Sequence, residues 1–147
     1  AMPEDFPVII FHNPDCGTSR NTLAMIEAAD YRPRVFDYLK SGWSRPLLEV
    51  LFAAMAISPR AALREKGTPA ASLGLLGPGV SDEAIVEAML AHPILVNRPI
   101  VVTPLGVRLC RPSEIVFEIL RQAPARFVKE DGETVMPVDR LRGPEGA

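Results

Sequence analysis

The fold is decided by residues 8–19, which read VIIFHNPDCGTS. The apolar run at residues 8–11 is rich in β-branched side chains and predicts a buried strand. Residues 12–18 are rich in turn formers, and the apolar residues after them predict a helix that begins near Ser19. A second strand is expected at residues 34–39. The order strand, loop, helix, strand is typical of a βαβ unit and predicts an α/β fold.

Helices are expected in the middle of the chain. Pro46 suits the first turn of a helix over residues 47–56, and another helix is expected over residues 58–66. Ser81 precedes two acidic residues, which places a capping hydroxyl and negative charge at the start of a further helix. These helices form an insert between the two halves of the predicted sheet.

Strands return in the last third of the chain. Residues 100–103 and 107–110 flank the turn sequence TPLG and predict a β-hairpin. Residues 112–114, which read PSE, open a final helix. Proline, glycine and charge accumulate from about Ala123 onward, so we expect the C-terminal tail to be loosely held.

We interpret the whole chain, residues 1–147, as a single domain. Its core is a small, central, mixed β-sheet flanked by helices, formed by about residues 8–39 and 94–121. The helical insert covers about residues 44–92, and the tail follows the core.

Composition limits the classes of function. Of the 147 residues, 48% are hydrophobic, so the chain can bury a core. The formal net charge is -2, from 16 basic and 18 acidic residues. This balance argues against a nucleic-acid partner, because dedicated nucleic-acid binders carry a large basic excess. It leaves room for a local basic pocket, and most of the basic residues are arginine, which suits oxyanions.

The cysteine count and the hydropathy pattern predict the compartment. Two cysteines are too few for a disulfide framework. The longest apolar run, at residues 50–57, is far shorter than the ~18 residues of a membrane span. The first residues, AMPED, are acidic and unlike a signal peptide. We therefore expect a reducing, cytoplasmic setting and no membrane partner.

Cys16 lies where the first strand meets the first helix. Free backbone N–H groups at a helix start favour anions and the thiolate form of a cysteine. Gly17 lets a ligand approach the backbone, and Thr18 and Ser19 add hydroxyl donors. His12 lies four residues before Cys16, and an imidazolium there would favour the thiolate further. The pattern predicts a reactive thiol at an anion site, and the alternatives are an inert cysteine and a structural histidine.

The spacing after Cys16 predicts how the thiol is regenerated. A dithiol site needs Cys-x-x-Cys, whereas this chain has Ser19 in the second position. The other cysteine, Cys110, ends an apolar strand and is interpreted as a small buried hydrophobic residue. An oxidised or substituted Cys16 should therefore need an external thiol for its reduction.

Arg64, Arg98 and Arg111 lie at junctions between predicted elements. Taken singly, each is more often a solvated residue. Together with a thiol at a helix start they predict a pocket for a small tetrahedral oxyanion, since one guanidinium can bind two oxygens. The base rate of about 5–6% cis for X-Pro bonds predicts a trans bond between Arg98 and Pro99. The chain has no P-loop, no His-Glu-x-x-His and no cysteine pair for zinc, so no metal site is expected.

Three stretches, residues 12–23, 92–106 and 109–114, resemble the signature segments of the glutaredoxin-coupled arsenate reductases. The resemblance extends over about residues 8–133. It implies a thioredoxin-like fold with a helical insert and the reduction of arsenate to arsenite. It further implies that glutathione and glutaredoxin are the reductants, with glutathione as a co-substrate and no bound cofactor.

The resemblance also assigns roles to individual residues. It implies that Cys16 attacks arsenate as a thiolate and that His12 helps to lower the pKa of that thiol. Arg64, Arg98 and Arg111 are implied to hold the oxyanion and its intermediates. The peptide bond before Pro99 is implied to be cis, against the expectation from the base rate.

Two alternatives come from related proteins. One is a thioredoxin-like regulator that binds RNA polymerase and senses oxidants through Cys-x-x-Cys, and Ser19 in the second position argues against it. The other is a thiol reductase that acts on a different small substrate. Phosphate and arsenate have similar shape and charge, so the pocket residues leave this second alternative open.

Overall fold

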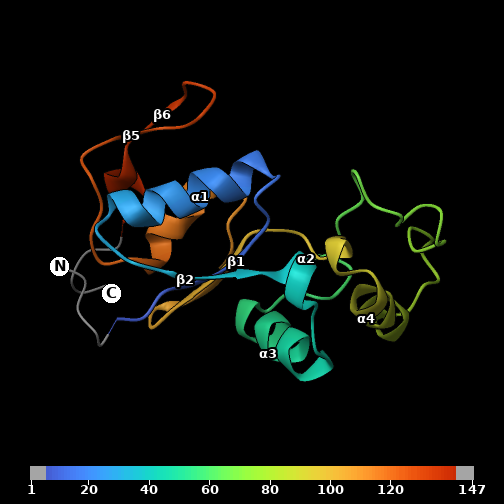
Figure 1. The fold of residues 1–147 in the computed structure, drawn as a ribbon. Helices are drawn as coiled ribbons and strands as arrows, with labels where there is room; N and C mark the ends of the chain where they lie inside the picture. Colours follow the sequence, from blue (N-terminus) through green and yellow to red (C-terminus); the bar gives the residue numbers. More distant parts are fainter. Residues whose placement is uncertain (1–5, 142–147) are drawn as a thin grey trace. The chain divides into compact units, whose positions relative to one another are not determined.

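The computed structural model describes residues 6–141, which form two compact units. The first unit contains the chain up to Asp37 and from Arg98 onward, and the second contains Tyr38–Asn97. The two units can be followed by colour in Figure 1. Each unit is described below by itself.

The first unit is built on a four-stranded sheet in the order β2-β1-β3-β4. The strands are β1 (Ile9–His12), β2 (Arg34–Asp37), β3 (Ile100–Thr103) and β4 (Gly106–Leu109). β1 pairs in parallel with β2 and antiparallel with β3, which continues into the β3–β4 hairpin. The predicted α/β class, the first strand and the hairpin are therefore confirmed. The second strand ends at Asp37, two residues before its expected end.

Helix α1 (Gly17–Ala28) connects β1 to β2 and packs against the 3-10 helix η2 (Ser113–Ile119). Met25 and Ile26 of α1 lie in the main apolar core with side chains from the sheet and from η2. The helix begins two residues earlier than expected, because Cys16 itself takes the N-cap position.

The last predicted helix is η2, a 3-10 helix and not an α-helix. Its buried side chains are Ser113, Val116, Phe117 and Ile119. Three of them, at positions 113, 116 and 119, are spaced three residues apart, which matches the three residues per turn of a 3-10 helix. After η2 come the short strands β5 (Phe127–Val128) and β6 (Thr134–Val135). They pair as a hairpin, and the 3-10 helix η3 (Pro137–Asp139) follows them.

The structure describes only part of the tail that we expected to be loosely held, and that part packs on the core. Val135 of β6 is 7% exposed and belongs to the main core, and Phe127 of β5 packs against that core. Residues 142–147, the end of the tail, lie outside the described residues.

The second unit is helical. It contains α2 (Tyr38–Ser41), α3 (Arg45–Met55), α4 (Asp82–Ala91) and the 3-10 helix η1 (Pro93–Leu95). Pro46 lies in the first turn of α3 and Ser81 caps α4, as predicted, whereas α3 begins two residues earlier than expected, with Ser44 as its N-cap. Within this unit α3 contacts α4, and α2 contacts η1.

The prediction of a helix over residues 58–66 is wrong. This segment forms turns, and its backbone then pairs with a distant segment. Arg64 N–H donates to the Leu95 carbonyl at 2.8 Å, and Asn97 N–H donates to the Ala62 carbonyl at 2.8 Å. Because these backbone groups are used in the tertiary pairing, they are not available for the i→i−4 bonds of a helix.

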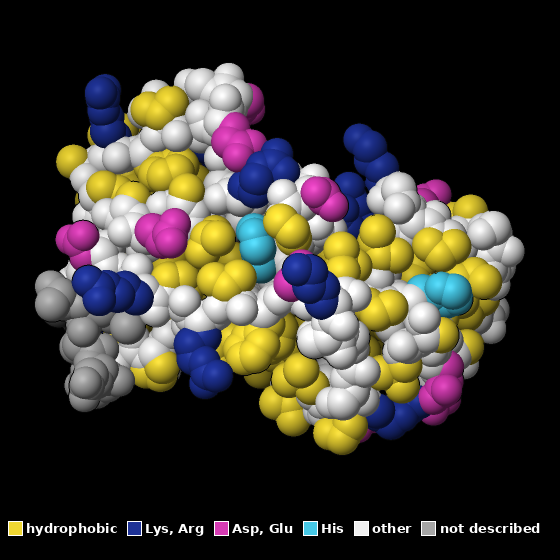
Figure 2. Space-filling model, viewed as in Figure 1, with side chains coloured by type: hydrophobic (Ala, Val, Ile, Leu, Met, Phe, Trp, Pro, Cys, Tyr) yellow, Lys and Arg dark blue, Asp and Glu magenta, His cyan; other side chains and the backbone are white. Residues whose placement is uncertain are grey.

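Charged side chains are scattered over the face drawn in Figure 2, where basic and acidic groups are interspersed with apolar ones. No helix within residues 6–141 is long and apolar enough to cross a membrane.

Candidate active site

The loop between β1 and α1 is a tight turn built by Asn13. The Asn13 carbonyl accepts a hydrogen bond from Cys16 N–H at 3.1 Å, and its side-chain oxygen accepts one from Asp15 N–H at 2.9 Å. An asparagine that bonds its own backbone two residues on is a common turn former. The turn places Cys16 at the N-cap of α1, with an extended backbone at φ -103° and ψ 120°.

The Cys16 thiol is surrounded by donors although it is only 9% exposed. Burial raises the pKa of Cys16, but the Ser19 backbone N–H and the Arg98 and Arg111 guanidiniums lower it by more. The net direction is down, toward the thiolate. Arg111 Nη1 lies 3.8 Å from the sulfur. The site therefore favours an anionic, nucleophilic sulfur.

The two arginines flank the β3–β4 hairpin at its open end, one before β3 and one after β4. Ile100 pairs with Leu109, so residues 98 and 111 face each other across the open end of the hairpin. Arg111 Nη1 accordingly donates to the Arg98 carbonyl at 3.0 Å. The Arg98–Pro99 and Arg111–Pro112 bonds are both cis. The first agrees with the resemblance and overrides the base rate, and the second was not expected.

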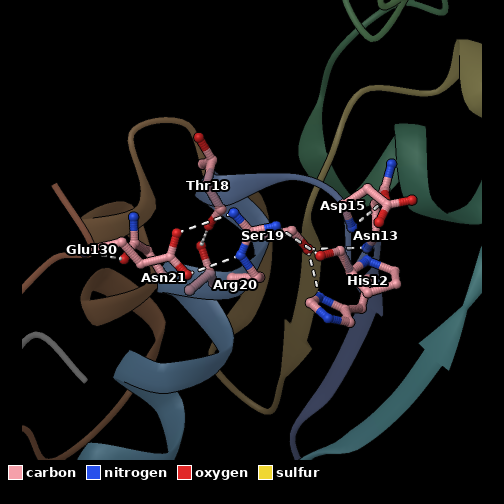
Figure 3. A network of polar contacts seen from close by, with 10 residues as sticks. His12, Asn13, Asp15, Thr18, Ser19, Arg20, Asn21 and Glu130 are labelled. Atoms are coloured by element: carbon pink, nitrogen blue, oxygen red, sulfur yellow. Dashed lines mark hydrogen bonds and ion pairs between the residues drawn. The ribbon is translucent and has the colours of Figure 1, made fainter.

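His12 contacts Ser19 at the base of the loop. Its Nδ1 atom shares a hydrogen bond of 2.6 Å with Ser19 Oγ, which also accepts the Asn13 N–H at 3.1 Å. Figure 3 shows the three side by side. Burial lowers the pKa of His12, Asp37 raises it and Arg20 lowers it, with a net fall that favours the neutral ring. This differs from the imidazolium expected from sequence.

Gly17, Thr18 and Ser19 form the first turn of α1, two residues earlier than the sequence predicts. The Ser19 hydroxyl is fully buried and engaged with His12 and Asn13, so the contribution of Ser19 to the thiol is its backbone N–H. A Cβ atom added at Gly17 would meet its nearest neighbours at 3.6 and 3.7 Å, which is ordinary contact. The Thr18 carbonyl accepts a hydrogen bond from Thr22 Oγ1.

Arg64 belongs to the second unit. It is half-buried, and its Nε atom donates to the Lys66 carbonyl at 3.1 Å. Its contact with an oxyanion stays a prediction.

Cys110, in contrast, is fully buried in the apolar core of the first unit, where burial raises the pKa of its thiol. The prediction that it packs as a small hydrophobic residue is confirmed.

Glu130, which no sequence pattern indicates, lies in the turn between β5 and β6. Its carboxylate forms two hydrogen bonds with Arg20, the residue that follows Ser19 in α1. The two residues are 110 positions apart, and no local pattern links them. The pairing of β5 with β6 and the hydrogen bonds of Glu130 with Arg20 and Asn21 bring this carboxylate to the start of α1.

Within residues 6–141, no group of three or more His, Cys, Asp or Glu side chains could hold a metal ion. The groups around Cys16 are instead cationic or neutral donors, which suit an oxyanion.

The sequence and the structure are similar to known arsenate reductases. Residues 11–119 match the model of the ArsC family. The chain is 58% identical over 130 residues to an arsenate reductase of Rhizobium meliloti, which covers 88% of this chain and 93% of that protein. It is 57% identical over 130 residues to arsenate reductase ArsI2 of Synechocystis sp., covering 88% and 93%.

A solved structure supports the fold. The arsenate reductase of Vibrio cholerae superimposes with a TM-score of 0.75 at 39% identity, covering 80% of this chain and 100% of that one. The mixed four-stranded sheet with flanking helices is a thioredoxin-like fold, as the resemblance implies.

Proposed function

The chain belongs to the ArsC family, and from this premise we propose that it is an arsenate reductase, which converts arsenate to arsenite in arsenic detoxification. The observation that carries the proposal is the Cys16 thiol at the start of α1, where Ser19, Arg98 and Arg111 favour the thiolate. The names of the relatives supply the substrate, and the chemistry of the site agrees with it. We place the reaction in the cytoplasm.

Arsenate binds beside Cys16, where its charge is balanced by the two guanidiniums. Arg98 and Arg111 lie next to the sulfur before any substrate arrives, held by the hydrogen bond from Arg111 to the Arg98 carbonyl. Such preorganised donors stabilise charge that develops on oxygen without further reorganisation. Arg64 is proposed as a third donor to the same oxyanion, and Gly17 and Thr18 as its backbone contacts.

The first chemical step is an attack of sulfur on arsenic. The Cys16 thiolate forms a sulfur–arsenic bond, one arsenic–oxygen bond breaks, and the oxygen takes up protons and leaves as water. Arsenic stays in the As(V) state. His12 acts on this step through Ser19, because it holds the hydroxyl of the residue whose N–H reaches the sulfur.

The reducing electrons come from external thiols. Ser19 replaces the second cysteine of a dithiol site, and Cys110 is buried with a raised pKa. The thiol of glutathione therefore displaces a second oxygen from arsenic, and this oxygen leaves as water. The new sulfur–arsenic bond joins glutathione to Cys16 through the arsenic atom. Glutathione is thus a co-substrate, and no bound cofactor is required.

Glutaredoxin completes the cycle. Its thiolate attacks the glutathione sulfur and forms a disulfide, while the electron pair of the arsenic–glutathione bond stays on arsenic and gives As(III). Water then breaks the Cys16–arsenic bond and releases arsenite together with the Cys16 thiol. One disulfide is formed for each arsenate reduced, so the electrons balance.

The test is arsenate-dependent oxidation of NADPH, coupled through glutathione reductase, glutathione and glutaredoxin. We expect turnover with the complete mixture and none when glutathione or glutaredoxin is omitted. Full turnover with thioredoxin alone would contradict the proposed reductants. Turnover with a different small oxidised substrate, and none with arsenate, would favour the second type of thiol reductase.

A further inference from the structure

We propose that Glu130 is a positioning residue of the Cys16 site, which holds the guanidinium of Arg20 over the loop that precedes Cys16. The kinetic part of this inference rests on the proposed function, whereas its test on the thiol does not. The evidence lies in the contacts of Arg20, in the attachment of the β5–β6 turn to α1, and in the charges nearby.

All three nitrogens of the Arg20 side chain are engaged. Nε lies 2.9 Å from one carboxylate oxygen of Glu130, and Nη2 lies 3.1 Å from the other. The third nitrogen, Nη1, donates to the carbonyl of Pro14 at 2.8 Å. Two parallel hydrogen bonds fix the plane of a guanidinium. The carboxylate therefore decides where the third nitrogen points, and it points at the loop two residues before Cys16.

Glu130 is itself anchored to α1. Its backbone N–H donates to the side-chain oxygen of Asn21 at 3.0 Å, and its Oε1 atom lies 3.7 Å from the position of a Cβ at Gly17. Figure 3 shows Asn21, Arg20 and Glu130 together beside the first turn of the helix. The turn between β5 and β6 thus attaches to the same helical turn that carries the reactive thiol.

The charge of Arg20 reaches the thiol. Glu130 raises the pKa of Arg20 most, and the thiolate of Cys16 raises it further. Because attraction between two charges is mutual, a well-placed Arg20 favours the thiolate of Cys16. A guanidinium released from Glu130 would gain rotamer freedom and spend more time in solvent, where this attraction is screened.

A purely stabilising role does not explain the pair. The side chains of Arg20 and Glu130 are 44% and 50% exposed, and exposed ion pairs contribute little to folding. Lys129, the neighbour of Glu130, already ties this turn to η2 through its 2.8 Å contact with Glu114. The contact of Glu130 with Arg20 therefore serves mainly to order the loop at Cys16 and adds little to the stability of the fold.

The decisive experiment is the pH dependence of Cys16 alkylation by iodoacetamide, followed by mass spectrometry and without arsenate. We expect Glu130→Ala to move the midpoint to higher pH and to slow alkylation near neutral pH by about two- to fivefold, the size typical of an exposed charged pair. If Glu130 acted on Cys16 only through its own negative charge, its removal would move the midpoint to lower pH, because removing a negative charge favours a thiolate. The sign of the shift thus separates positioning from simple electrostatics.

Three further variants complete the design: Arg20→Met, the double variant and a matched control. Arg20→Met should give a similar upward shift, and Arg20→Met combined with Glu130→Ala should add nothing to it, because Glu130 acts through Arg20. Glu133→Ala is the matched control: Glu133 lies in the same turn and contacts Lys129 at 3.0 Å. It should leave the midpoint unchanged. Circular dichroism and a thermal melt establish that each variant is folded, and Glu130→Gln replaces Glu130→Ala if the latter is not.

The outcomes distinguish the two proposals. An unchanged or lowered midpoint in the folded Glu130 variant, or additive shifts in the double variant, would overturn the positioning role. If the alkylation midpoints shift as expected but the protein does not reduce arsenate, the positioning role is supported and the proposed function is refuted. With arsenate as substrate, Glu130→Ala should lower kcat more than it changes KM.

Discussion

Cys16 and Cys110 belong to the same unit of the molecule and have opposite chemistry. Both are buried, with 9% and 0% of their surface exposed. The pKa of Cys16 is lowered and that of Cys110 is raised. Burial raises the pKa of both thiols; it dominates at Cys110, whereas hydrogen-bond donors outweigh it at Cys16. What differs is the set of hydrogen-bond donors around each sulfur.

The surroundings of the two sulfurs follow from the elements that carry them. Cys16 caps a helix and receives the Ser19 N–H and two guanidiniums. Cys110 directly follows β4, and its sulfur has an acceptor beside it, the Arg108 carbonyl at 3.7 Å. A donor stabilises a thiolate, whereas an acceptor stabilises the protonated thiol. The comparison teaches that the hydrogen-bonding groups around a cysteine, which follow from its place in the fold, decide whether it is a nucleophile.

The strongest test of this difference between the two cysteines is to replace the proposed nucleophile, Cys16. Cys16→Ser should lower arsenate turnover on the order of a thousandfold or more, because a hydroxyl at neutral pH is a far weaker nucleophile than a thiolate. The coupled NADPH assay measures the loss. A folded Cys16→Ser variant with normal activity would refute the assignment of Cys16.

The pH dependence of alkylation compares the two thiols directly. Since the pKa of Cys16 is lowered, its reaction with iodoacetamide should reach half its maximum below pH 9.0, the ordinary thiol value. The rate should fall as the pH drops through that midpoint, because the thiolate is then protonated. Cys110 should remain unlabelled in the native protein throughout. Mass spectrometry of each peptide follows both sites, and labelling of Cys110 before Cys16 would reverse the assignment.

The two guanidiniums provide the next test. Arg98→Lys and Arg111→Lys keep a positive charge but lose the planar fork that binds two oxygens. We expect each to lower kcat/KM for arsenate by about tenfold to a hundredfold, somewhat less than the loss of a complete oxyanion donor. Steady-state kinetics gives the value. Normal arsenate kinetics in both variants would show that the pocket lies elsewhere.

The positions of Arg98 and Arg111 relative to each other follow from the sequence. The turn at residues 103–106 fixes the register of the hairpin, and the pairing of Ile100 with Leu109 follows from it. Residues 98 and 111 then face each other at the open end. The same reasoning extends to β1 and α1, whose apolar periodicity and turn residues are local signals.

Other parts depend on contacts that no local pattern encodes. The segment at residues 58–66 has helix-forming residues, yet its backbone bonds with Leu95 and Asn97 instead. The lowered pKa of His12 depends mainly on burial in the finished fold, which is a property of distant residues. Glu130 reaches Arg20 from 110 positions away. Tertiary packing decides all three, and a single sequence carries little trace of it.

His12 and Ser19 should act as one unit. His12→Ala and Ser19→Ala each remove their 2.6 Å hydrogen bond, which loosens the turn that aims the Ser19 N–H at the sulfur. We expect each to slow turnover by about tenfold, as small displacements in a reactive geometry do, and to raise the midpoint of Cys16 alkylation. The double variant should be no worse than either single one. Additive losses would mean that the two residues act independently.

The smallest effect is expected at Cys110, where the comparison predicts a role in packing alone. Cys110→Ala removes a buried sulfur and should lower the free energy of unfolding by about 1 kcal/mol, the cost of a small cavity. Cys110→Ser is the matched variant: it keeps the size but buries a hydroxyl in an apolar core, so it should cost more than the alanine. Urea denaturation measures both. Turnover should stay normal in Cys110→Ala, because the reducing thiols come from outside the chain. Loss of turnover with the fold intact would make Cys110 a partner of Cys16 in the reaction, and the contrast between a reactive and a packed thiol would fail.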